Sequence, residues 1–93
     1  MIKTFKSKEA ERIFNGNFSR KLPGDIQKAV ARKLEMLNAA NQLESLRIPP
    51  SNRLESLKGD RSRQHSLRIN NQWRICFIWK SGDAYDVEIV DYH

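Results

Sequence analysis

The most apolar strand-like segment of this sequence reads Trp73-Arg74-Ile75-Cys76-Phe77-Ile78-Trp79. Its large side chains recur at every second position, which is typical of a β-strand with two unlike faces. Trp73, Ile75, Phe77 and Trp79 share one face, and alternation places Arg74 on the other face with Cys76 and Ile78. The segment therefore predicts a central strand that carries an arginine opposite its aromatic row.

The segments on both sides of this strand continue the β pattern. We predict short strands at 54–58 and 64–70 and a closing strand at 85–91, whose side chains are rich in β-branched residues. Asn70-Asn71 predicts a two-residue hairpin, because Asn tolerates a positive φ, and Ser81-Gly82-Asp83 predicts the next turn. The second half of the chain is thus expected to form a meander of strands.

The first half of the chain is predicted to be mainly helical. After a short strand at 2–6, Ser7 is a candidate cap for a helix over 8–15 that ends at Gly16. Pro23 opens a longer helix that runs to Ala40 and carries one apolar stripe. Residues 41–53 contain two adjacent prolines and are expected to form an ordered loop across the sheet edge. The predicted fold is α+β, a single domain over 1–93 with two N-terminal helices packed on a twisted antiparallel sheet.

Composition excludes several classes of protein. The 93 residues are 39% hydrophobic and 30% charged, which indicates a globular chain rather than a disordered one. A single cysteine, Cys76, allows no internal disulfide, and with two histidines it provides no zinc site. We therefore expect neither a metal nor a cofactor. The sequence contains no apolar run of membrane-spanning length and no signal-peptide core near its first residue, so we expect a cytoplasmic protein.

The net charge of +6 is unevenly distributed along the chain. Residues 47–80 hold eight Lys/Arg against two acids, whereas residues 81–93 hold four acids and no Lys or Arg. A basic middle followed by an acidic tail suggests a phosphate-binding surface with acid–base groups beside it. A solubilising surface that binds nothing is the alternative reading of the charge alone.

Arg74 is the first candidate for a functional residue. A buried arginine on a central strand needs a partner. One reading is an ion pair with Asp86, Glu88 or Asp91 of the adjacent strand. The other is an anion site in which the guanidinium grips a phosphate, with Lys58 and Arg68 adding positive charge on the same face.

The second candidate is the strand end Asp91-Tyr92-His93, where an acid, a phenol and an imidazole follow a rigid strand. These groups suit cleavage of RNA by its own 2′-hydroxyl, which needs a base, an acid and cations around the phosphorane-like transition state, but no metal. His93 can act as acid or base near neutral pH, Asp91 can be the base or orient it, and Tyr92 can stack on a base or donate a proton. The residues leave open which of Asp91 and His93 is the base.

Three other residues have plainer readings. Cys76 is expected to be a small buried hydrophobe. His65 shares a face with Leu67 and Ile69 and is expected to be a core or edge histidine. Glu55 is expected to be a surface acid, with a role as a base as the alternative.

The chain resembles the HigB toxins of the RelE/ParE superfamily of bacterial toxin–antitoxin systems. The resemblance rests on four stretches together: Asn52-Arg53-Leu54-Glu55-Ser56-Leu57-Lys58-Gly59, Gln64-His65-Ser66-Leu67-Arg68-Ile69-Asn70, Gln72-Trp73-Arg74-Ile75-Cys76-Phe77 and Val87-Glu88-Ile89-Val90-Asp91-Tyr92-His93. It extends to the helix start at Leu22-Pro23 and covers essentially the whole chain.

This resemblance implies a RelE-like fold and a ribosome-dependent endoribonuclease that cuts translated messenger RNA. It implies catalytic roles for Lys58, Arg74, Asp91, Tyr92 and His93. It also implies a partner, a helix-turn-helix antitoxin similar to HigA. Some relatives have a histidine where this chain has Glu55, which shifts the acid–base work towards His93 and Asp91.

The basic residues around the expected site, Arg53, Arg61, Arg63 and Arg68, are predicted to contact the RNA. The sequence is also compatible with two other functions. One is a non-catalytic inhibitor of a protein target such as DNA gyrase, as in the ParE branch, and the other is an RNA- or ribosome-binding module without chemistry. Fold alone does not separate them.

Overall fold

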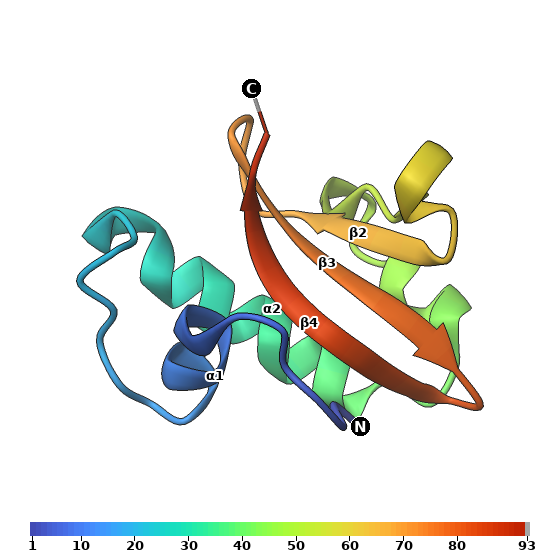
Figure 1. The fold of residues 1–93 in the computed structure, drawn as a ribbon, viewed down its shortest axis with the longest axis horizontal. Coiled ribbons are helices and arrows are strands. Elements are labelled where there is room, and N and C mark those ends of the chain that lie inside the picture. Colours follow the sequence, from blue (N-terminus) through green and yellow to red (C-terminus); the bar gives the residue numbers. More distant parts are fainter. Residues whose placement is uncertain (93) are drawn as a thin grey trace.

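The computed structural model describes residues 1–92 and shows two helices beside a four-stranded antiparallel sheet (Figure 1). The strands follow one another in the order β1-β2-β3-β4, so the predicted α+β meander is confirmed. The elements are α1 (Lys8–Phe14), α2 (Gln27–Ala39), β1 (Glu55–Ser56), β2 (Gln64–Arg68), β3 (Trp73–Lys80) and β4 (Asp83–Asp91), with short 3-10 turns at Gly24–Ile26, Leu43–Arg47, Pro50–Asn52 and Gly59–Arg61.

The core lies between α2 and the face of the sheet predicted to be apolar. Ile75 and Phe77 of β3 are buried there with Leu67 of β2. Facing them is the apolar stripe of α2, which is Val30, Leu34 and Leu37. Trp73 and Trp79 pack against this cluster from the two ends of β3. The alternation predicted for β3 is therefore confirmed. Arg74 and Cys76 lie on the opposite face of the sheet.

Local capping explains where α1 begins and ends. The Ser7 hydroxyl accepts a hydrogen bond from the Ala10 N–H at 3.0 Å, as predicted. Gly16, with φ of 86°, follows the last turn. Its N–H donates to the Ile13 carbonyl and the Asn17 N–H donates to the Arg12 carbonyl, which is the Schellman arrangement.

The predicted strand at 2–6 is wrong in detail. This segment runs parallel to β4 and pairs with it through two isolated bridges, from Ile2 to Ala84 and from Phe5 to Val87, rather than as a continuous strand. The reason is a bulge in β4 at Asp86, where φ is 52°. The Asp86 N–H leaves the ladder and donates to the Thr4 hydroxyl at 2.8 Å, so a continuous ladder cannot form.

The tight hairpin lies at the other predicted turn. Asn70 and Asn71 do not have positive φ, and residues 69–72 form a four-residue connection. The Asn70 side chain instead accepts hydrogen bonds from the N–H groups of Gln72 and Trp73, both at 2.8 Å. Ser81 and Gly82, with φ of 52° and 82°, make the two-residue turn between β3 and β4.

Two predicted strands are shorter than expected, and the loop before them is ordered. The strand at 54–58 is reduced to Glu55–Ser56, because the chain turns away at Gly59, where φ is 68°. The strand at 64–70 ends at Arg68. Within residues 41–53, two 3-10 turns pack around Asn52, which is fully buried. In the part of the chain that the structure describes, no helix has the length and apolar character needed to span a membrane.

Candidate active site

The sheet face opposite the helices carries the candidate site. Side chains of directly paired residues in antiparallel strands lie on the same face. The register pairs Arg68 with Arg74 and Glu55 with Ser66. Two arginines are therefore side by side on this face, where like charges repel. Such a pair needs negative charge nearby.

Arg74 is nearly buried and is held at several points. Its Nε donates to the Ser66 hydroxyl at 2.8 Å, and one terminal nitrogen donates to the Arg53 carbonyl at 2.7 Å. The Glu55 carboxylate lies 3.6 Å from the same nitrogen. These contacts fix the plane of the guanidinium and still leave N–H groups for a ligand, since an arginine has five.

The carbonyl of Arg53 reaches Arg74 because of the preceding loop. Asn52 donates its side-chain amide to the carbonyls of Leu46 and Ile48, at 3.1 and 3.4 Å, and accepts a hydrogen bond from Lys33. Burial beside Arg32 lowers the pKa of Lys33, with desolvation the larger cause. Arg53 follows in the left-handed region, with φ of 43°. Asn52 therefore anchors the chain where its carbonyl turns towards the site.

Tyr92 lies on the Arg74 side of the sheet. The Arg74 guanidinium carbon is 5.8 Å from the centre of the Tyr92 ring, within the range of a cation–π contact. The Tyr92 N–H donates to the Gln72 carbonyl at 2.5 Å, which ties the end of β4 to the connection between β2 and β3. Figure 1 shows these two segments meeting near the C-terminal end of β4.

Asp91 and His93 complete the predicted terminal group, but only Asp91 is described. Asp91 pairs with Trp73 across the ladder, so alternation places it on the helix side rather than the Arg74 side. Its carboxylate accepts a hydrogen bond from the Gln72 side chain at 3.2 Å. His93 lies outside the described residues. The structure thus brings Arg74 and Tyr92 together on one face of the sheet and places Asp91 on the other face.

The other predicted cations, Lys58 and Arg63, lie near the Gln64 end of β2. The Leu57 N–H donates to the Gln64 carbonyl, so the exposed Lys58 follows at the level of Gln64 rather than of Arg68. Arg63 is exposed in the turn before β2. Gln64 and Arg68 are four residue steps apart along β2, a span of about 13 Å at the usual rise of a strand.

Arg61 and Arg68 are partly engaged by protein groups. Arg61 contacts the Glu88 carboxylate at 3.2 Å, and Lys6 approaches that carboxylate at 3.7 Å. Arg68 donates to the Asn71 side chain at 2.6 Å. Glu88 therefore neutralises part of the charge around Arg61, whereas the neutral Asn71 leaves the charge of Arg68 unchanged.

The plainer readings of His65 and Cys76 agree with the structure. The His65 ring packs on Phe77 with 5.9 Å between ring centres, and burial lowers the pKa of this histidine. Cys76 is fully buried, and burial raises the pKa of its thiol, opposed in part by Arg61. A buried neutral thiol is not a nucleophile.

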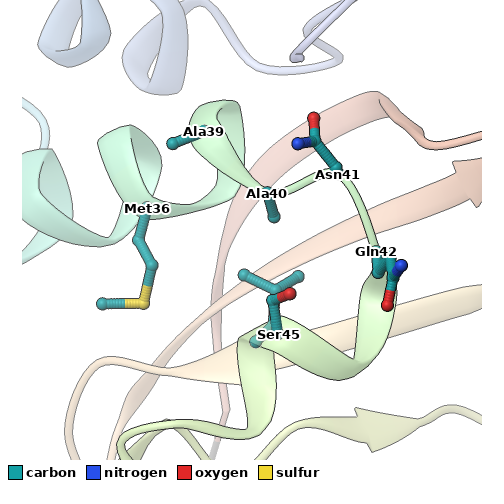
Figure 2. Close-up of a pocket in the computed structure, with 7 residues that line it drawn as sticks. Met36, Ala39, Ala40, Asn41, Gln42 and Ser45 are labelled. Carbon is teal, nitrogen blue, oxygen red and sulfur yellow. The ribbon is translucent and has the colours of Figure 1, made fainter.

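A hollow of about 510 Å³ lies away from this face, between the end of α2 and the turn at Leu43–Arg47 (Figure 2). Met36 and Ala39 line it on one side, and Asn41, Gln42 and Ser45 line it on the other. No charged side chain lines it. A phosphate has no counter-charge there, so this hollow is not the candidate site.

Sequence reasoning missed two parts of the site. The carboxylate that contacts Arg74 is Glu55 of β1, not an acid of β4. The hydroxyl that orients the Arg74 guanidinium belongs to Ser66. Glu55 therefore belongs to the site rather than to an unrelated surface. The role of Ser66 could have been predicted from the alternation in β2, which places this small polar residue on the same face as the arginines.

The similarity to known proteins extends over nearly the whole chain. Residues 3–93 match the family described as the RelE-like toxin of the type II toxin–antitoxin system HigB. The chain is 41% identical to Toxin HigB-1 of Vibrio cholerae over 85 residues, which is 90% of each protein. It is 31% identical to Endoribonuclease HigB of Proteus vulgaris over the full length of both chains. An uncharacterized protein of Haemophilus influenzae is 34% identical over 69 residues, 74% of this chain and 68% of the other.

Proposed function

Because this chain belongs to the family of RelE-like HigB toxins of type II toxin–antitoxin systems, we propose that it is an endoribonuclease that cuts translated messenger RNA on the ribosome. Membership of the family implies an antitoxin partner. We propose that this partner is a HigA-like protein with a helix-turn-helix fold. The relative from Proteus vulgaris that matches over its full length is named as an endoribonuclease, which supports the proposed reaction.

The observation that carries the proposal is the arginine pair on the face opposite the helices. Arg68 and Arg74 are directly paired, and Arg74 is oriented by Ser66 and the Arg53 carbonyl. One carboxylate, Glu55, stands beside Arg74 at 3.6 Å. A phosphate diester at this place would offset the remaining positive charge, and a guanidinium with a fixed plane suits its oxygens.

In the proposed reaction the 2′-hydroxyl of the RNA loses its proton to a base, and its oxygen attacks the neighbouring phosphorus. The bond from phosphorus to the 5′-oxygen breaks, and an acid protonates that oxygen. The products are a 2′,3′-cyclic phosphate and a 5′-hydroxyl. Arg74 stabilises the charge that develops on the phosphoryl oxygens. The resemblance to the family assigns the same role to Lys58, although it lies at the level of Gln64 rather than of Arg74. The step needs no metal ion.

We propose the remaining roles from the positions of the described residues and from the resemblance to the family. Tyr92, 5.8 Å from Arg74 and partly exposed, is placed to stack on a base beside the scissile phosphate. The resemblance to the family, rather than position, assigns the base and the acid to Asp91 and His93, because Asp91 lies on the helix side of the sheet and His93 lies outside the described residues. Glu55 orients Arg74 and shares the proton transfer where its carboxylate reaches the 2′-hydroxyl. Arg53, Arg63 and Arg68 contact the RNA backbone, and Arg61 contributes less because it is engaged by Glu88.

The experiment that tests this proposal is cleavage of a defined message in a reconstituted translation reaction. We expect wild type to cut the message only when ribosomes translate it, leaving a 2′,3′-cyclic phosphate. Arg74→Ala should lower the cleavage rate by about 100-fold or more. Arg74→Lys should be similarly slow, because an ammonium group cannot replace the planar guanidinium and its paired N–H donors. Deletion of His93 should also slow cleavage.

The matched control is Arg47→Ala. Arg47 is exposed and pairs only locally with Glu44, so the variant removes the same charge away from the site. Its rate should equal that of wild type. Intact messages in the presence of active wild-type toxin, with growth still arrested in cells, would overturn the proposal and make DNA gyrase the next target to assay.

A further inference from the structure

The connection between α1 and α2 exposes an aromatic ring among cations. Phe18 is 66% exposed, and Arg12, Arg20 and Lys21 lie around it, where they line a hollow of about 200 Å³ together with Glu9. Lys8 and Arg12 line a second hollow of about 290 Å³ next to it. We call this group, Lys8, Arg12, Phe18, Arg20 and Lys21, the Phe18 surface.

The ring is presented by a backbone that is fixed on both sides. Before it, the Asn17 N–H donates to the Arg12 carbonyl at the end of α1. After it, Ser19 is fully buried, donates its N–H to the Gln27 side chain at 3.0 Å and accepts from it at 2.6 Å. An apolar ring that is exposed on an ordered loop is available to a partner without a further ordering cost.

The charges of this surface favour a polyanion. The surface contains four cations, Lys8, Arg12, Arg20 and Lys21, and two acids, Glu9 and Glu11. The Glu9 carboxylate accepts a hydrogen bond from the Ser19 hydroxyl. The net charge of the surface is positive. A single ring surrounded by cations suits an unpaired base flanked by phosphates, since the base stacks and the phosphates pair with Lys and Arg.

A protein partner fits this surface less well. Protein interfaces have a contiguous apolar core. Among the described residues the other large exposed apolar side chains, Met1, Ile48 and Tyr92, belong to other parts of the sequence. In Figure 1 the connection between α1 and α2 projects from the helix side of the molecule. Of these four residues only Phe18 lines the hollows of the Phe18 surface.

From these observations we infer that the Phe18 surface binds an unpaired segment of ribosomal RNA. The inference rests on the proposed function, which places the toxin on the ribosome. The candidate site lies on the sheet face opposite the helices, whereas the Phe18 surface joins the two helices on the other side. An RNA segment bound there is thus distinct from the message at Arg74, and the ribosome itself supplies such segments.

The test measures the affinity of the toxin for ribosomes at several salt concentrations, with and without bound message. Phe18→Ala should weaken binding by about tenfold, and Phe18→Trp should preserve it, because stacking is retained. Arg20→Ala combined with Lys21→Ala should reduce the slope of log affinity against log salt by about 2, close to one for each lost phosphate contact.

Two controls match these changes elsewhere. Ile48→Ala removes an exposed apolar side chain, and Lys3→Ala with Lys80→Ala removes two exposed cations. Both should stay within about twofold of wild type, because isolated surface changes have small effects. Thermal unfolding of each variant shows whether its fold is intact.

Each outcome decides the inference. Weaker binding of the Phe18 and Arg20/Lys21 variants, equal with and without message, supports it. The inference fails if these variants match the controls, if their defect requires bound message, or if they lose affinity for the antitoxin instead. Binding is read without cleavage, so a wild-type toxin that binds through Phe18 but cuts nothing would refute the proposed function alone.

Discussion

Arg74 shows how single residues make a charged group tolerable within a packed sheet. Its guanidinium is nearly buried, and desolvation of an ion is costly unless each donor finds an acceptor. Ser66 and the Arg53 carbonyl accept two of its hydrogen bonds, and Glu55 adds a counter-charge. The contacts that stabilise the arginine are the same ones that aim it.

Ser66→Ala tests this dual role. Removal of the hydroxyl leaves the Arg74 Nε without its acceptor, which should lower the free energy of unfolding by about 1–3 kcal/mol. Cleavage should slow further than the stability change explains, since the guanidinium loses its fixed plane. Urea unfolding and the cleavage rate at a temperature where both proteins are folded measure the two effects.

Ser56→Ala is the control for that variant. Ser56 lies on the neighbouring strand, is exposed and contacts His65 rather than Arg74. Its change in stability should stay within about 0.5 kcal/mol. Equal effects of the two substitutions would show that Ser66 does not position the arginine.

His65 predicts a loss of stability on acidification. Burial against Phe77 lowers the pKa of this histidine in the folded state below its ordinary value near 6.5. The unfolded chain therefore binds a proton first as pH falls, so stability decreases from about pH 6.5 downward through the lowered pKa and is unaffected above it. His65→Gln should remove this part of the pH dependence. The check is the difference in unfolding free energy between wild type and variant, at about pH 7.5 and about pH 5.5.

At the scale of elements, the bulge in β4 joins the N-terminal segment to the sheet. Asp86 takes a positive φ, and its N–H and carboxylate both contact the Thr4 hydroxyl. The Val87 N–H beyond it donates to the Thr4 carbonyl at 3.1 Å. The bulge therefore covers part of the outer edge of β4, where an open strand edge would otherwise invite pairing with another chain.

Substitutions at Asp86 test whether the positive φ is the cause. Asp86→Val places a β-branched side chain in the left-handed region and should cost about 1–2 kcal/mol of unfolding free energy. Asp86→Asn, which tolerates that region, should cost less than half as much. Equal losses in chemical denaturation would indicate that the Asp86 carboxylate, not the backbone conformation, matters.

At the scale of the whole molecule, the distribution of charge divides the cations around β2 into two classes. Lys58 and Arg63 are exposed at one end, whereas Arg61 lies against Glu88. An ion-paired arginine releases fewer counterions from RNA than an exposed lysine, because its charge is already compensated. The contribution of each cation to RNA binding therefore follows from its protein neighbours as well as from its charge.

Lys58→Ala should lower the slope of log affinity against log salt for RNA on the ribosome by about 1. Arg61→Ala should change that slope by clearly less, although it removes the same formal charge. Filter binding across a salt series measures both slopes. A larger change in slope for Arg61→Ala than for Lys58→Ala would show that the ion pair with Glu88 does not reduce the contribution of Arg61 to RNA binding.

Much of the fold was predictable because its signals are local. Alternation in β3 defined the core face, the stripe of α2 defined the helix that covers it, and Ser7 and Gly16 defined the limits of α1. The hairpin at Asn70 was misread for a local reason too. Asparagine can supply either a positive φ or a side-chain acceptor, and here it supplies the acceptor.

The partners within the site depended on tertiary structure. Alternation along one strand predicts which face of the sheet a residue occupies. It does not predict which residue of another strand lies next to it. Register set Glu55 beside Ser66 and Arg68 beside Arg74, and it placed Asp91 next to Trp73. The sequence alone therefore established the α+β meander and the core, and it singled out Arg74 as a candidate. Only the folded chain determined which carboxylate meets Arg74, because hydrogen bonds between strands fix register over long sequence separations.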